Sequence, residues 1–437
     1  MRAKSLVVLI VLAVILVAVA YLTSLRQTQF ATADKTIGTF IFPKLQEPDV
    51  INSIDKIEFI TANNTVMVQR VDNNWTAPSK YGYRIEFDKI RDFLITVSKL
   101  KVGSSIPDDK KELQNLHLIS PIDTSASTNV TTGTLINLYA QSNKVVASLL
   151  LGKEHTRTTG ESPWSRYGGF PDGRYILVNN KAYMVTETFH NIPSTDKDWL
   201  DKLLVNVQSS DIQEITVTET NDVTITLKRP ETGGDLKFDD LTPTQEMDTA
   251  KVNSLSGVFS YLELYDVVDP RITDTELGLD KPTICIAKTK NGQIYTLKLG
   301  KFYKETKDRY ARLSVEYNPP PEPEKASDTA TKPADEKQVE EAKKKKKEEQ
   351  EKLRKETQEL NEKLAKWVYV IRDYKIENVV GSRSAFVKEK KIEEKKEEKK
   401  EESAKDNTMQ ESKEKSGEGS SSQPAQTSSP STEEAKK

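Results

Sequence analysis

The side chains best suited to chemistry lie far apart in this sequence. None of its three histidines has a second ligand at the spacing that a helix or hairpin needs for a metal site. A single cysteine excludes an intramolecular disulfide. It lies in an apolar run typical of a buried strand, which favours a core residue over a reactive thiol. These residues are His117, His155, His190 and Cys285.

The acidic pairs do not have the spacing of catalytic carboxylates. Asp239 and Asp240, for example, are adjacent in a polar loop, whereas paired catalytic carboxylates converge across a cleft. The sequence also has no nucleophile elbow and no glycine-rich phosphate loop. We therefore predict no catalytic residue, no cofactor and no metal, and expect a protein that is not an enzyme.

One segment, from Arg157 to Tyr175, collects residue types that anchor interfaces. Aromatic and arginine side chains alternate there with glycines on a predicted loop. The candidate interface residues are Arg157, Trp164, Arg166, Tyr167, Phe170 and Arg174. The alternative is that Trp164 and Tyr167 simply cover the edge of a sheet.

The charges exclude some partners. Across 437 residues, 65 Lys and Arg nearly balance 67 Asp and Glu, and the net charge of -2 argues against a nucleic-acid-binding protein. Many of the charges lie in two stretches, roughly 322–366 and 388–437, which leaves an ordinary globular composition between them. No small-molecule substrate is indicated.

The N-terminus predicts a membrane anchor. From Leu6 to Leu22 the chain is apolar apart from Tyr21, and Arg2 and Lys4 precede the run. The positive flank is expected to stay in the cytoplasm, which makes residues 1–25 a single-pass anchor of the cell inner membrane and places the bulk in the periplasm. A cleaved signal peptide, with small residues at 18–20 or 31–33, is the alternative. Residues 26–50 are expected to be a linker.

The same order of elements occurs twice, roughly 160 residues apart. Each copy has an alternating strand, an amphipathic helix, a proline-closed turn and a hairpin that ends in Leu-Gly-Lys. The matched segments are 54–59 with 212–217, 90–100 with 252–262, 116–121 with 277–282, and 151–153 with 299–301. We predict an α+β fold of two related, mostly antiparallel sheet units, 51–208 and 209–387, each with one amphipathic helix.

The last hairpin is predicted to differ between the copies. In the first, Ser165–Tyr167 enters, Pro171–Gly173 turns and Tyr175–Val178 returns; in the second, Asp308–Tyr310 and Trp367–Val370 enclose an insert at 319–366. The insert predicts a stalk that leaves as an extended proline-rich chain and returns as a charged helix over 334–366.

Three further segments lie outside the repeated elements. The seven-residue spacing of Leu353, Leu360 and Trp367 leaves a short coiled-coil seam open as the alternative to a solvated helix. A short helix over 198–204 is expected to close the first copy, with no equivalent in the second. The tail 388–437 is too polar to bury a core and is expected to be disordered.

This pattern resembles the bacterial family called domain of unknown function 4340 (DUF4340). The resemblance covers residues 40–385 and lies in the N-terminal anchor, the opening strand 54–59, Trp75, the Leu-Gly at 151–152 before Arg166-Tyr167, and Trp199–Asp201. It implies repeats of one domain and association with ABC-type transport systems, including those of gliding motility. The expected function is a non-enzymatic accessory or scaffold protein in such an envelope complex. The alternative is a structural spacer that binds cell-wall polymer or another envelope protein.

Overall fold

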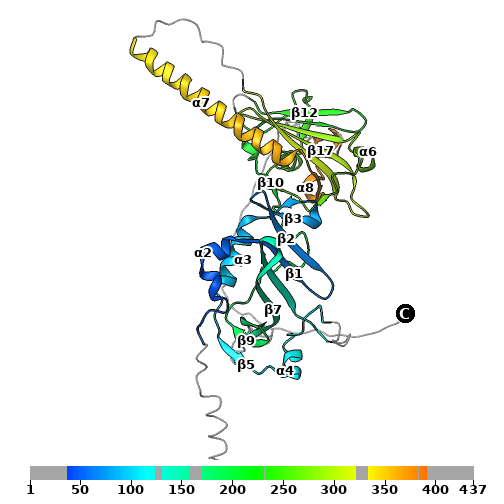
Figure 1. Cartoon of the computed structure of the whole chain (residues 1–437). Coiled ribbons are helices and arrows are strands. Elements are labelled where there is room, and N and C mark those ends of the chain that lie inside the picture. The colour runs from blue at the N-terminus through cyan, green and yellow to red at the C-terminus, as the bar shows by residue number, and fades with distance from the viewer. Residues whose placement is uncertain are drawn as a thin grey trace, which may run out of the picture. The chain divides into compact units, whose positions relative to one another are not determined.

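The computed structural model describes residues 37–123, 130–157, 170–230, 233–320, 333–381 and 383–390 (Figure 1). The expected anchor from Leu6 to Leu22, residues 321–332 of the insert, where an extended chain is expected, and the tail from 391 onward lie outside these residues. Among the described helices, none is both long and apolar enough to span a membrane.

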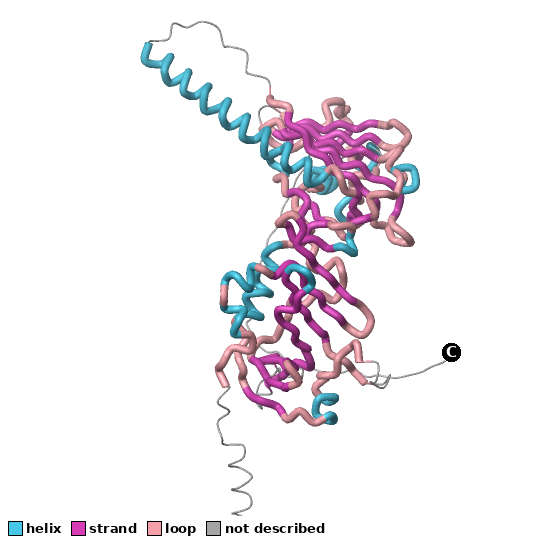
Figure 2. The backbone as a smooth tube through the Cα atoms, in the orientation of Figure 1, coloured by secondary structure: helices cyan, strands magenta, loops and turns pink. Residues whose placement is uncertain are grey.

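The first sheet has nine strands (Figure 2). In sheet order they are β4 (Tyr83–Arg84), β3 (Asn74–Ala77), β2 (Thr65–Val71), β1 (Ile54–Ile60), β6 (Thr134–Ala140), β7 (Lys144–Arg157), β8 (Phe170–Val178), β9 (Lys181–Val185) and β5 (Ser104–Ile106). Every pairing is antiparallel. The two-residue alternation of the opening strand therefore places Ile57 and Phe59 in the core, both 0% exposed.

The second sheet has seven strands, again all antiparallel. In sheet order they are β12 (Thr224–Lys228), β11 (Ile212–Thr218), β16 (Thr283–Thr289), β17 (Gln293–Phe302), β18 (Arg309–Tyr317), β19 (Val368–Ile371) and β15 (Asp266–Val268). Two short two-stranded sheets pair β10 (Leu203–Val205) with β14 (Leu262–Glu263), and β13 (Gln245–Met247) with β20 (Val387–Glu389). The predicted α+β class with two antiparallel sheets is confirmed.

The second sheet repeats the strand order of the first. The order β2-β1-β6-β7-β8-β9-β5 corresponds, strand for strand and in chain order, to β12-β11-β16-β17-β18-β19-β15. The first sheet has β3 and β4 in addition, beside β2. The two sheets therefore share one topology.

Short helices cover both sheets. They are α2 (Pro48–Asn52), α3 (Phe87–Ser98), α4 (Lys110–Asn115), α5 (Thr249–Ser256), α6 (Asp274–Leu277) and α8 (Asp373–Ile376). In α3 the predicted stripe is buried as expected, at Ile90, Phe93 and Val97. The matching α5 ends at Ser256, so the predicted helix stripe at Phe259 and Leu262 is buried from a turn and from β14 instead. Within the expected linker, Pro43–Gln46 forms a 3-10 helix and Leu45 is buried.

One hydrophobic core runs through both sheets. It joins Ile57 and Leu138 of the first sheet with Val217 and Leu297 of the second in a continuous cluster of buried side chains. Each sheet also has a small cluster on its other face, because alternate residues of a strand point to opposite sides. Leu116 and Leu118 lie in the first of these clusters, and Leu277 and Leu279 in the second.

The repeated Leu-Gly-Lys has a steric cause. A Cβ at Gly152 would overlap the carbonyl oxygen of Leu116, and a Cβ at Gly300 would overlap that of Leu277. The Leu116 carbonyl also accepts from the backbone N–H of Lys153 at 2.8 Å. Glycine is needed where the loop backbone approaches the strand this closely.

The predicted turn at Pro171–Gly173 is wrong. These residues lie inside β8, where bulges interrupt the pairing with β7 and where a side chain at Gly173 would collide with the carbonyl oxygen of Val185. The chain turns instead at Asn179 and Asn180, with φ of 49° and 61°, values that asparagine tolerates. Tyr175–Val178 is therefore the second half of the entering strand, and β9 is the returning one.

The predicted helix over 198–204 is also wrong. Trp199 and Leu200 are 3% and 0% exposed, and Leu200 bridges Ile85 before β10 begins. Two adjacent buried side chains suit an irregular, enclosed segment better than a helix with one apolar face.

The second unit does have an equivalent of this segment, contrary to expectation. Trp199 O accepts from Glu86 N at 2.9 Å, before α3, and Phe386 O accepts from Asp248 N at 2.8 Å, before α5. Phe386 is 1% exposed and leads into β20, so paired backbone continues to Glu389, past the expected start of the tail at Lys388.

The charged insert contains α7 (Pro333–Leu364), in agreement with the predicted helix, and Figure 1 shows it extending away from the second sheet. Its C-terminal turns pack against β18, with Thr357 and Leu364 2% and 0% exposed. Asn361 Oδ1 accepts from Val315 N at 3.0 Å, and Thr357 Oγ1 accepts from Gln293 Nε2 at 3.0 Å. Leu360 packs against the chain's own core, so its seven-residue spacing serves this docking rather than a coiled coil with another helix.

Replacing Asn361 with alanine is expected to lower the free energy of unfolding by about 1–2 kcal/mol, because it leaves the Val315 N–H of β18 without its acceptor. Urea denaturation followed by circular dichroism measures this. The exposed Glu359, two residues earlier, gives the control: Glu359→Ala should change stability by less than about 0.5 kcal/mol. Equal effects of the two substitutions would contradict the docking contact.

Candidate functional site

The six predicted interface residues are described only in part. Arg157 and Phe170 are cross-strand neighbours at the end of the β7–β8 pair, and Phe170 is 57% exposed. Trp164, Arg166 and Tyr167 lie outside the described residues. The interface between these residues and a partner stays a prediction.

Arg174, the sixth residue, contacts the protein itself. Its Nε donates to Gly152 O at 3.0 Å and its Nη1 to Thr188 O at 3.0 Å. Burial lowers the pKa of Arg174, although the carboxylate of Glu154 opposes this. In the second sheet Arg309 donates to Gly300 O at 2.9 Å, and burial lowers its pKa in the same way. The shared contact identifies Arg174 as a brace for the glycine carbonyl of the Leu-Gly-Lys segment within β7.

The only pairing of histidine with a carboxylate in the described residues lies beside this brace. His155 Nδ1 is 2.5 Å from Asp172 Oδ1, across the bulged β7–β8 pair. The His155 ring meets Tyr175 edge to face at 5.8 Å, as Tyr303 meets Tyr310 at 5.5 Å in the second sheet. His155 therefore occupies a cross-strand aromatic position, which favours a structural role over proton transfer. Its partner could not be found from spacing, because Asp172 was expected in a turn.

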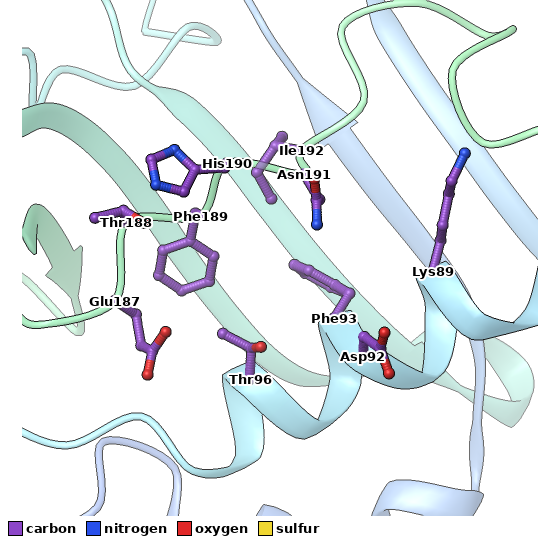
Figure 3. A pocket seen from close by; sticks show the side chains of 10 residues that line it. All are labelled: Lys89, Asp92, Phe93, Thr96, Glu187, Thr188, Phe189, His190, Asn191 and Ile192. Carbon is purple, nitrogen blue, oxygen red and sulfur yellow. The ribbon is translucent and has the colours of Figure 1, made fainter. Parts of the chain in front are cut away.

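A hollow of about 230 Å³ lies between α3 and the loop 187–192 (Figure 3). The rings of Phe93 and Phe189 approach each other across it; Asp92 and Thr96 line it from α3, and Glu187 lines it from the loop. Its volume is below the range of about 300–1,000 Å³ usual for small-molecule sites. The hollow is therefore better read as a surface depression than as a substrate pocket.

Asp198 organises the chain beside this hollow. Its carboxylate accepts from the backbone N–H and hydroxyl groups of Ser194 and Thr195, at 2.7–2.9 Å. The resulting turn buries Trp199, whose Nε1 donates to Asn191 O at 2.9 Å and whose ring contacts Phe59 at 5.0 Å. Asp198 and Trp199 thus stabilise the fold of the first unit.

Replacing Asp198 with asparagine is expected to cost about 1 kcal/mol near pH 7, as for the loss of a capping carboxylate. Burial acts to raise the pKa of Asp198, but hydrogen bonds from Thr195 and Ser194 outweigh it and lower the pKa below 3.8. A lowered folded pKa stabilises the fold above the unfolded value, and this contribution disappears as the pH falls through the folded value.

Urea denaturation at about pH 7 and about pH 3 checks this prediction, since the difference between the native chain and Asp198→Asn should shrink at the lower pH. Asp235→Asn, at an exposed position, is the control. A difference that stays constant with pH would mean that the ionised carboxylate is not the stabilising form.

A buried carboxylate at the junction of the two units was missed by sequence reasoning. Asp266 of β15 has a side chain 9% exposed and accepts from Lys80 Nζ of the first unit at 2.8 Å. Lys197, also of the first unit, lies 3.8 Å from its other oxygen. The available signal was a charged residue inside the apolar run 264–268. This cluster ties the loops of the first unit to the edge strand of the second.

Aromatic rings close the same junction. Tyr83 of β4 contacts Trp367 at 5.0 Å and Tyr369 of β19 at 6.3 Å, both edge to face. Burial raises the pKa of Tyr83 and of Tyr369, so both hydroxyls stay protonated and donate, to Asp201 O at 3.1 Å and to Leu364 O at 3.0 Å. The junction is packed like a protein interior, and its aromatic and hydrogen-bond contacts hold the two units together.

Within the described ranges, no group of three or more His, Cys, Asp or Glu residues is placed to hold a metal ion. Cys285 is 0% exposed in β16, and burial raises the pKa of its thiol to about 12, which disfavours the reactive thiolate.

Comparison with protein families gives one result. Residues 75–282 match the family described as a domain of unknown function (DUF4340). The match begins at Trp75 in β3 and ends at Pro282, immediately before β16, so it crosses from the first sheet into the second unit. Searches of curated proteins and of solved structures give no significant match.

Proposed function

Starting from the DUF4340 domain at residues 75–282, we propose that this chain is a non-enzymatic scaffold protein. Leu6 to Leu22 anchor it in the cell inner membrane, and its bulk lies on the extracytoplasmic side. Its partner is a protein of an envelope transport complex, of the ABC or gliding type. The partner assignment is supported by the family resemblance, and the anchor by the apolar run behind Arg2 and Lys4.

The observation that carries the scaffold function is the continuous core across the two sheets. Buried side chains of both units belong to one cluster, and the Asp266 and Tyr83 contacts fix the junction. Flexible domains are usually joined by more polar interfaces and move relative to each other. A junction packed like a domain interior supports a protein that holds its partners at a fixed geometry.

We further propose that the two units arose from one duplicated domain. The shared strand order, the paired Gly152 and Gly300, and the paired Arg174 and Arg309 support this. In this reading the insert that contains α7 replaces the Asn179-Asn180 turn of the first unit.

Crosslinking in intact membranes tests the proposal. The full chain carries an epitope after Lys437 and a photoreactive amino acid at Lys345, which is exposed on α7, or at Glu263 of β14 for comparison. A membrane permease and its ATPase should be recovered through the epitope. Their absence from every crosslinked product would reject the transport-complex assignment.

The second candidate function is a spacer that binds wall polymer, favoured by the exposed lysines 343–347 on α7. Pull-down of the full chain on purified cell-wall material separates the two candidates. Retention that is lost when these lysines are changed to glutamine, without recovery of a transporter, would favour the spacer.

A further inference from the structure

An apolar groove crosses the first unit at the N-terminal end of α3. It consists of two hollows, of about 440 and 450 Å³, that share Asn73, Trp75 and Phe87 as a common wall. The first hollow lies between α2 and α3, and the second continues past Leu203 to Leu360 on α7. We call these two adjoining hollows together the Phe87 groove.

The groove exposes large apolar side chains. Phe87 is 60% exposed, Leu203 42% and Ile95 39%, while Trp75 and Ile90 at its floor are 7% and 1% exposed. Isolated apolar residues on a surface need no explanation, but apolar residues gathered in a hollow with a few polar groups are typical of a binding site. Each hollow also falls within the range of about 300–1,000 Å³ usual for ligand pockets.

The rim of the groove is basic. Its charged lining residues are Arg70, Arg84, Arg91, Lys363 and Asp201. Asp201 is already paired with Arg84 at 2.6 Å, and Arg91 is paired with Asp88 outside the lining. Arg70 donates to the backbone oxygen of Asn52 at 2.9 Å, and no carboxylate of the described residues forms an ion pair with Arg70 or Lys363. Arg70 and Lys363 are therefore available to form ion pairs with carboxylates of a binding partner.

We propose that the Phe87 groove binds an acidic amphipathic segment of a partner protein, with apolar side chains in the two hollows and carboxylates at Arg70 and Lys363. This inference deepens the proposed scaffold function and rests on it. Basic residues beside exposed apolar ones also suit an anionic membrane surface. The concave shape favours the peptide, since individual side chains can enter the two hollows and a broad bilayer cannot.

The test uses the full chain in nanodiscs of zwitterionic lipid and two fluorescent peptides. Each peptide has about 16 residues, about 24 Å as a helix, with leucines on one face; the other face carries glutamates in one peptide and lysines in the other. We expect the glutamate peptide to bind at least about tenfold more tightly than the lysine peptide by fluorescence anisotropy.

Variants of exposed residues assign the binding to the groove. Phe87→Glu and the double variant Arg70→Glu/Lys363→Glu should each weaken the glutamate peptide by about tenfold or more. Tyr374→Glu is the control, because Tyr374 is 72% exposed on α8 outside the groove. This variant should bind the glutamate peptide as tightly as the native chain does. Circular dichroism of each variant verifies that it is folded.

The proposal is overturned if the two peptides bind equally or if the groove variants bind as the native chain does. It is also overturned if the native chain binds neither peptide but associates with anionic vesicles in a Phe87-dependent manner, which assigns the groove to lipid. Each of these results leaves the crosslinking of a transporter through α7 unaffected, so a failed groove and a failed scaffold are distinguishable.

Discussion

Replacing Gly300 with alanine should lower the free energy of unfolding by about 3 kcal/mol or more, and Gly152→Ala should do nearly the same. The added Cβ at Gly300 overlaps the carbonyl oxygen of Leu277, and the one at Gly152 overlaps that of Leu116. A backbone oxygen cannot rotate away as a side chain can. The loop must therefore separate from the strand, and the small apolar cluster beneath it opens.

Gly381→Ala is the matched control, because its nearest neighbour would be the Ala385 Cβ at 3.7 Å, an ordinary contact. Thermal unfolding of the three variants compares them directly. If Gly300→Ala were as stable as Gly381→Ala, the close approach of the Leu277 carbonyl to β17 would be incorrect.

Replacing Asp266 with asparagine should destabilise the chain by about 2–3 kcal/mol, because removing one partner of a buried ion pair leaves the other charge uncompensated. Lys80, 2.8 Å away, has a side chain only 18% exposed. Since the pair joins the two units, we also expect the native unfolding transition to broaden as the units begin to unfold separately. Denaturation followed by tryptophan fluorescence and by circular dichroism detects both effects.

The exposed pair of Asp211 and Lys290, with side chains 37% and 61% exposed, supplies the comparison. Asp211→Asn should change the free energy of unfolding by less than about 0.5 kcal/mol. The double variant Lys80→Met/Asp266→Leu should recover much of the loss, because an apolar pair of similar volume needs no charge compensation. Failure of this recovery would mean that Asp266 also acts through other contacts, such as Lys197 at 3.8 Å or its hydrogen bond to Val267 N.

The paired strands and hairpins of the two units could be predicted from the sequence because their signals are local. Alternating apolar residues at 54–59 and 212–217 fix which face of each strand is buried, and Leu-Gly-Lys marks corresponding positions in β7 and β17. The stripe of α3 is likewise a local pattern with one buried face.

The last hairpin was misread because two turn signals compete within one segment. Pro171–Gly173 has the composition of a turn, but a bulged strand uses proline and glycine too. Asn179-Asn180 is the weaker signal by composition and is the actual turn. Arg174 and Arg309 are equivalent because each donates to the glycine carbonyl of a Leu-Gly-Lys segment, and this becomes visible only once β8 is known to be continuous.

The junction could not be predicted, since its contacts are distant in sequence. Asp266 meets Lys80, and Tyr83 meets Trp367, across separations that no spacing rule describes. The Phe87 groove was missed for the same reason. Its lining comes from α2, α3, α7 and strands β1 to β4 and β10, and its exposed apolar side chains are ordinary core residues when read along the chain.

The attachment of α7 has a mechanical consequence. The helix is 32 residues long, about 48 Å, and its firmest contacts with the sheet run from Thr357 to Leu364, over about 12 Å at its base. A sideways force at the N-terminal end of α7 therefore acts over a lever several times longer than the docked segment. The force on β18 is correspondingly larger than the applied force. Trp367 and Tyr369 follow Leu364 within five residues and pack against Tyr83, so the torque is transmitted to the junction between the two units.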